Sequence, residues 1–209
     1  MVPIETWVAY SGACVLIILA PGPDNILAIS RDISQGRFAA LVSSAGAGLG
    51  LLVHVAAAVL GLAVVIQTSA AAFGVVKIIG AGYLLWLGIK AIRSKNLVTF
   101  STHGEVAIRS VFTSGFLTNV LNPKPALFVL AFVPQFVSPA YGSVTVQMAL
   151  LGTWLALLAF VIFATLGSFS SVLTRWLEKH PRATLGVNYG TGFTFIAAGV
   201  SVALLENRK

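Results

Sequence analysis

The sequence predicts an all-α membrane protein with six transmembrane helices, built as two inverted repeats of three helices. Hydrophobic residues make up 57% of the 209 residues, and charged residues only 9%, whereas a soluble domain carries about 25% charged residues. The chain has too few polar residues to cover the surface of a soluble fold of this size. We therefore expect it to lie in a lipid bilayer. A Pro-x-Pro motif also occurs once in each half of the chain, at 21–23 and 123–125.

Six stretches of the chain reach the length of about 20 apolar residues that a membrane crossing needs. The first lacks the positively charged start of a signal peptide, so we interpret it as a retained span. One transmembrane domain then covers 1–209, with repeat 1 over about 4–92, a cytoplasmic connector over about 93–110 and repeat 2 over about 111–205. The expected spans are 4–30, 38–66, 70–92, 111–137, 144–173 and 184–205.

The basic residues predict the orientation of these spans. The formal net charge is +7, and most of the basic residues fall in three gaps that all lie on one side of a six-span protein. The positive-inside rule makes that side cytoplasmic and places both termini outside. The basic, aromatic stripe of a nucleic-acid-binding protein is absent, so no nucleic acid partner is expected. The residues in these gaps are Arg31 and Arg37; Lys90, Arg93, Lys95 and Arg109; and Arg175, Lys179 and Arg182.

The two Pro-x-Pro motifs interrupt the first span of each half, which are helices 1 and 4. An odd number of spans per half forces the halves into opposite orientations, and matched interruptions in such inverted repeats indicate a binding site near the membrane midplane. A simpler interpretation is that these prolines only kink the helices. Because the breaks match between the halves, we favour the binding site. The break residues are Pro21, Gly22 and Pro23 in repeat 1, and Pro123 and Pro125 in repeat 2.

Each break supplies polar backbone groups inside the membrane. A proline removes one backbone donor and frees the carbonyl four residues earlier, while the half-helix that resumes presents free N–H groups that suit a carboxylate. Together they match the amine and the carboxylate of an amino acid. Asn122 is the expected N-cap of the second half-helix, and Asn25 and Asn119 flank the breaks with amide side chains.

Two charged residues at the breaks are the main candidates for the site. Asp24 is the only carboxylate well inside a span, and Lys124 occupies the first turn of a half-helix, where a positive charge is disfavoured. We expect Lys124 to bind the substrate carboxylate. Asp24 either forms a fixed ion pair with Lys124 or takes up a proton and couples transport to protons, which we favour. His54, in the second span, is either a proton or substrate partner or a hydrogen-bonded packing residue.

These residues also carry a resemblance that covers nearly the whole chain. The sequence resembles the lysine-exporter superfamily, specifically its homoserine/threonine-exporter-like translocators (LysE/RhtB). Each motif is loose alone, but their order and spacing are specific. The motifs are Pro21-Gly22-Pro23-Asp24 with Gly36; Gly46 to Gly50 with His54; Gly80-Ala81-Gly82-Tyr83-Leu84 with Gly88; Gly115-Phe116-Leu117-Thr118-Asn119; Asn122-Pro123-Lys124 with Phe128; and Pro134-Gln135-Phe136.

The resemblance implies a bacterial inner-membrane exporter of amino acids or related metabolites that uses the proton gradient and binds no cofactor. It points to Asp24 and Lys124 as functional residues. A single intramembrane carboxylate suits neutral substrates such as threonine, homoserine or branched-chain amino acids better than dibasic ones. The alternatives are an exporter of basic amino acids or inorganic cations, or an intramembrane enzyme, for which no nucleophile–base set or metal-ligand spacing is evident. A homodimer is left open.

Overall fold

The computed structural model describes residues 2–19, 22–62, 70–93, 106–170, 172 and 181–204. Within these ranges the chain forms helices joined by short turns and contains no strand, so the all-α prediction is confirmed there. The helices are α1 (Ile4–Leu19), α2 (Pro23–Gln35), α3 (Arg37–Ala57) with the π-helical η1 (Ala58–Leu62), α5 (Ala70–Arg93), α6 (Ile108–Val120), α7 (Pro123–Phe132), the short 3-10 helices η2 (Val133–Phe136) and η3 (Pro139–Tyr141), α8 (Val144–Ser168) and α10 (Pro181–Leu204).

The helices have the length and apolar character of a membrane protein. Among the described residues, Arg37–Gly61 and Val144–Ser168 are each long and apolar enough to cross a membrane, and two bent pairs of helices pass the same test together. These pairs are α1 with α2, bent by 61°, and α6 with Pro123–Phe136, bent by 50°. Helices α5 and α10 have 24 residues each, a length of about 36 Å that exceeds the roughly 30 Å of the hydrocarbon core.

The helix ends at the two proline motifs follow from proline chemistry. Helix α1 ends at Leu19 and α2 begins at Pro23, while α6 ends at Val120 and α7 begins at Pro123. Proline suits the first helical position because its missing N–H would have no partner there. Gly22 is the N-cap of α2 in extended backbone, and Pro21 lies outside the described residues.

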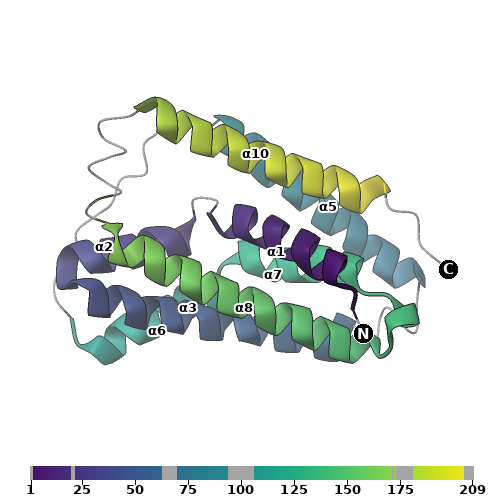
Figure 1. The fold of residues 1–209 in the computed structure, drawn as a ribbon, viewed down its shortest axis with the longest axis horizontal. Helices are drawn as coiled ribbons and strands as arrows, with labels where there is room; N and C mark the ends of the chain where they lie inside the picture. The colour runs from purple at the N-terminus through teal and green to yellow at the C-terminus, as the bar shows by residue number, and fades with distance from the viewer. Residues whose placement is uncertain are drawn as a thin grey trace.

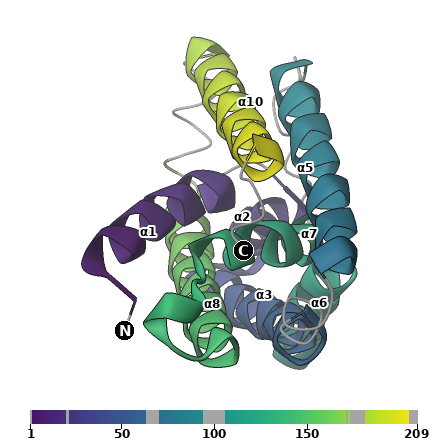
Figure 2. The ribbon, with the colours of Figure 1, turned by 90° about the vertical axis from the view of Figure 1, so that its right-hand side faces the viewer.

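The helices form layers that place α1 and α7 in the middle (Figures 1 and 2). Helices α5 and α10 lie side by side along one face of the molecule, and α3, α6 and α8 form the opposite face. Glycines allow the close approaches within these faces. A Cβ at Gly115 of α6 would collide with the backbone carbonyl of Ser43 in α3, and a Cβ at Gly192 of α10 would lie 2.8 Å from the carbonyl oxygen of Gly88 in α5.

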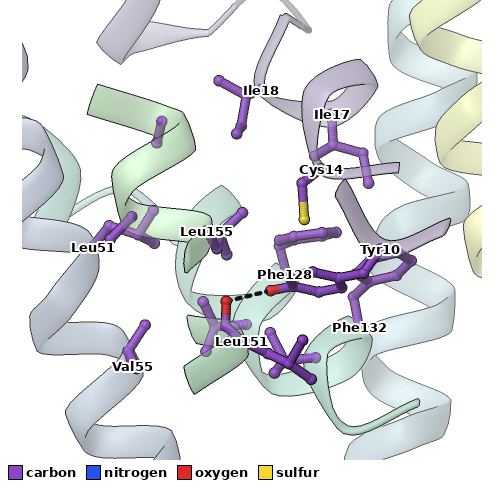
Figure 3. Packing of buried hydrophobic residues seen from close by; sticks show 14 of the residues in the cluster. Tyr10, Cys14, Ile17, Ile18, Leu51, Val55, Phe128, Phe132, Leu151 and Leu155 are labelled. Atoms are coloured by element: carbon purple, nitrogen blue, oxygen red, sulfur yellow. Dashed lines mark hydrogen bonds between the residues drawn. The ribbon is translucent and has the colours of Figure 1, made fainter. Parts of the chain in front are cut away.

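A buried aromatic cluster holds α1, α7 and α8 together (Figure 3). The ring of Tyr10 stacks on Phe132 with centroids 6.1 Å apart, and Phe132 stacks on Phe128 at 4.5 Å. The hydroxyl of Tyr10 donates to the carbonyl oxygen of Leu151 in α8 at 3.0 Å, which satisfies a polar group inside the core. The cluster therefore fixes α1, which precedes the first proline motif, against α7, which begins at the second.

Candidate functional site

The carboxylate of Asp24 lies in the first turn of α2 and meets the second half of the chain. Its Oδ2 atom accepts a hydrogen bond of 2.9 Å from Nδ2 of Asn122, and the two side chains are each only 8% exposed. The other oxygen of Asp24, Oδ1, is buried and has no hydrogen-bond partner within the described part of the chain. The structure thus joins the two proline motifs through one charge-assisted hydrogen bond and leaves one acceptor of the carboxylate unused.

Asn122 also begins α7, as the sequence predicts for an N-cap residue. Its Oδ1 atom accepts from the backbone N–H of Lys124 at 3.0 Å, which satisfies one of the free donors at the helix start. Its amide nitrogen is then directed at Asp24. One side chain therefore determines both where α7 begins and where the Asp24 carboxylate is held.

Lys124 brings a positive charge to the same place from the first turn of α7. Its ammonium lies 5.5 Å from the ring centroid of Phe195 in α10, a distance at which a cation is attracted to an aromatic face. The ammonium is also close enough to Asp24 for the two charges to interact. The half-buried side chain of Lys124 thus lies among α2, α7 and α10.

Two of the predicted polar residues bind backbone carbonyls near the ends of the half-helices. Nδ2 of Asn25 donates to the carbonyl oxygen of Ile18 at 2.9 Å, and Nε2 of His54 lies 3.1 Å from the carbonyl oxygen of Asn119. Because a carbonyl oxygen only accepts, the second contact requires a hydrogen on Nε2. Pro123 was expected to free the Asn119 carbonyl, and His54 is one of the groups that satisfy it.

The side chain of Asn119 supplies a second unused acceptor. It is 1% exposed, and its Oδ1 atom has no hydrogen-bond partner in the described ranges. The side chain lies near the Asp24 carboxyl. Buried polar atoms normally find partners, and the oxygens on Asp24 and Asn119 that have none within the described residues keep the capacity to accept a hydrogen bond.

The structure separates the predicted residues into two sets. Asp24, Asn119, Asn122 and Lys124 form one cluster, which we call the break cluster. Asn25 and His54 lie beside it and support the ends of α1 and α6.

Over the described residues, no group of three or more His, Cys, Asp or Glu side chains gathers to hold a metal ion. Of the prolines, Pro23 and Pro123 start the two half-helices and Pro125 follows within α7.

Arg31 is a residue whose place the sequence did not predict correctly. Its charge was expected in a loop between the first two spans, but Arg31 lies within α2 and is only 5% exposed. The reason is that α2 continues to Gln35, so the helix is longer than its apolar stretch. The spacing between Asp24 and Arg31 could have predicted this burial, because residues seven positions apart in a helix lie on the same face.

Comparison with known proteins gives a family for most of the chain. The LysE type translocator family matches residues 15–206. No solved structure matches the chain significantly.

Similar proteins match over almost their full lengths. The homoserine/homoserine lactone efflux protein of Salmonella typhimurium is 29% identical over 200 residues, which cover 95% of this chain and 96% of that protein. The leucine efflux protein of Enterobacter sp. (strain 638) is 30% identical over 206 residues, or 97% of each chain. An uncharacterized membrane protein of Vibrio cholerae is 30% identical and covers 96% of this chain and 97% of its own length.

Proposed function

This chain belongs to the LysE type translocator family, and we propose on that premise that it exports a small amino acid or a related metabolite from the cytoplasm as a secondary transporter. It is a membrane protein of a family of translocators and not an enzyme. The observation that carries the proposal is the buried hydrogen bond between Asn122 and Asp24. It brings Asp24 next to the start of α7, which carries Lys124, and one oxygen each of Asp24 and Asn119 has no partner among the described residues.

We place the break cluster inside a bilayer crossed six times, with each bent pair of helices as one broken span. Support comes from the apolar character of the pairs and the length of α5 and α10. A twofold axis between two inverted repeats would map α3 onto α8 and α5 onto α10, and each of these two pairs packs together. The basic gaps would face the cytoplasm and both termini the outside of the inner membrane.

In this arrangement the break cluster holds an amino acid by both of its charged groups. The ammonium of Lys124 and the N-terminal end of α7 attract the substrate carboxylate. The unused oxygens of Asp24 and Asn119 accept from the substrate ammonium. Asn122 keeps the Asp24 carboxylate in position, and Asn25 and His54 keep the half-helix ends in place.

Transport is coupled to protons if the Asp24 carboxylate binds either the substrate ammonium or a proton. An ionised Asp24 pairs with the substrate ammonium, and an empty site in a low-dielectric surrounding favours protonation of the same carboxyl. The site then opens to the outside with substrate bound and opens again to the cytoplasm with a proton bound. Competition for Asp24 makes this cycle an antiport, in which protons moving inward drive the substrate outward.

The helix packing suggests which parts move during that cycle. Helices α5 and α10 pack on each other along their lengths and contact the remaining helices mainly through α7 and α1 (Figure 2). Lys124 of α7 touches Phe195 of α10 at this boundary. Rocking of the α5–α10 pair against the other helices would open the break cluster to one side at a time.

Neutral amino acids are the substrates that the site favours. Two relatives are named for efflux of homoserine, homoserine lactone and leucine, and a dibasic substrate would need more negative charge than Asp24 supplies. Basic amino acids and inorganic cations are therefore the less favoured cargo.

Transport into proteoliposomes tests the proposal. With an acidic lumen and a neutral outside buffer, we expect labelled leucine, homoserine or threonine to accumulate and a protonophore to abolish the accumulation. The absence of gradient-driven flux for every neutral amino acid would refute the preference for neutral substrates, and flux of lysine alone would favour the basic ones.

A further inference from the structure

Arg31 is a buried arginine with a donor atom that has no partner among the residues that the structure describes. Its Nη1 atom donates to Oε1 of Gln35 at 3.2 Å, while its buried Nε atom has no partner over the described ranges. No carboxylate forms an ion pair with Arg31 within the described part of the chain. A buried charge without a counter-charge is unfavourable for stability, and such a local violation is expected where function requires it.

Arg31 lies on the same side of α2 as Asp24 of the break cluster. Asp24, Arg31 and Gln35 lie on one stripe of the helix, and seven residues correspond to two turns, or about 10.5 Å along the axis. Asp24 bonds to Asn122 just after α6, and Gln35 donates to the carbonyl oxygen of Val106 just before α6 at 2.8 Å. The stripe therefore faces α6, and Arg31 lies between these two contacts.

The nearest acidic residue in the sequence does not neutralise Arg31. Asp32 lies on another side of α2, and its Oδ2 atom accepts a hydrogen bond from the hydroxyl of Ser170, beyond the end of α8. Asp32 therefore does not belong to the stripe of α2 that carries Asp24, Arg31 and Gln35.

We propose that Arg31 binds the carboxylate of the substrate on its way from the cytoplasm to the break cluster, as a first station before Lys124. A planar guanidinium with free N–H groups matches a carboxylate by two parallel hydrogen bonds. The distance of about 10.5 Å along α2 is too long for one small amino acid to contact Arg31 and Asp24 together. The substrate therefore binds first at Arg31 and then at the break cluster. The inference rests on the proposed export of amino acids and names a residue outside the break cluster.

The test compares substrates with and without a free carboxylate in proteoliposomes. Leucine and leucinamide form one pair, and homoserine and homoserine lactone the other. For Arg31→Gln we expect the half-saturation concentration of leucine and homoserine to rise about tenfold, as for a lost hydrogen bond to a charged group, while those of leucinamide and the lactone change less than about twofold. For Arg31→Lys, the half-saturation concentrations of leucine and homoserine should lie between those of the wild type and Arg31→Gln, because lysine keeps the charge and loses the planar geometry.

A matched control removes an arginine at the same end of the molecule. Arg37→Gln takes away an exposed guanidinium that lies 5.8 Å from the ring centroid of Phe169, and it should leave the half-saturation concentrations of both pairs unchanged. The melting temperature of Arg31→Gln in detergent should stay the same or rise, because no ion pair is lost.

Two results would overturn the proposal for Arg31. One is an equal loss of transport for substrates with and without a carboxylate, and the other is a lower melting temperature that accounts for the loss. If the wild-type protein moves none of the four compounds but moves another amino acid, the comparison is made with that amino acid and its amide. If it moves no amino acid, the export function itself fails, and the inference fails with it.

Discussion

Asn122 donates a 2.9 Å hydrogen bond to the carboxylate of Asp24, although 98 positions separate the two residues in the chain. The same asparagine caps the helix that carries Lys124. The position of the acid and the start of the helix that holds the base therefore depend on one another. A change at Asn122 should affect both, whereas a change at Asp24 should affect the chemistry and leave the helix in place.

Replacement of Asp24 by Asn should abolish accumulation driven by a pH gradient while the protein still inserts. The amide keeps the size of the side chain and an acceptor for Asn122, but it can no longer exchange a proton for a substrate ammonium. The assay is accumulation of labelled leucine in proteoliposomes. Glu5→Gln, which removes an exposed carboxylate at the start of α1, is the control. Wild-type accumulation by Asp24→Asn would remove Asp24 from the mechanism.

Replacement of Asn122 by Ala should lower stability through two losses. The missing N-cap costs about 1 kcal/mol, and the missing bond to a buried carboxylate costs about 1.5–3 kcal/mol. Asn122→Ser keeps a capping oxygen and should recover only the free energy lost with the N-cap. Denaturant unfolding in detergent micelles measures both variants, and equal stabilities of Ala and Ser would contradict the capping role.

Replacement of Gly115 by Val should separate α3 from α6. The new side chain would collide with the backbone carbonyl of Ser43, which cannot move without shifting the helix, so we expect a loss of about 3 kcal/mol. Gly82→Val is the matched control, because a Cβ at Gly82 meets no atom within 4 Å. A similar fall in melting temperature for both variants would contradict a specific packing role of Gly115, because valine has a higher helix propensity than glycine at either position.

Two substitutions of His54 distinguish a structural role from a role in proton transfer. Gln keeps a donor that can reach the Asn119 carbonyl, and Leu does not. If the contact at 3.1 Å is the role of His54, His54→Gln should retain transport with an unchanged pH profile, and His54→Leu should be destabilised by about 1–3 kcal/mol. A flattened pH profile for His54→Gln would instead make His54 a proton partner.

Single cysteines should reveal the orientation of the protein in the membrane. Native Cys14 is fully buried, so it should resist labelling from either side, and a Cys14→Ser background serves as the starting protein. A cysteine at exposed Ala140, in the turn before α8, should react with an impermeant maleimide in intact cells. A cysteine at exposed Ser110 should react only after permeabilisation, and the reverse pattern would invert the proposed topology.

Local chemistry explains why much of the candidate site could be predicted from sequence. The N-cap role of Asn122 follows from its place before a proline that starts a helix, and the structure confirms it. The unusual cost of a charge in an apolar stretch singled out Asp24 and Lys124. Arg31 was misplaced, because its burial depends on how far α2 extends and on which helix covers that face.

The sequence by itself determined the helical, membrane-embedded character of this protein, its family and the residues at which the half-helices start. These properties depend on composition and on local rules for proline, asparagine and charge. Only the tertiary structure decided that Asp24 meets Asn122, that His54 reaches the Asn119 carbonyl and that the Nε atom of Arg31 has no partner among the described residues. Such contacts join positions far apart in the chain, and they depend on how closely the helices approach, which glycines such as Gly115 set through packing.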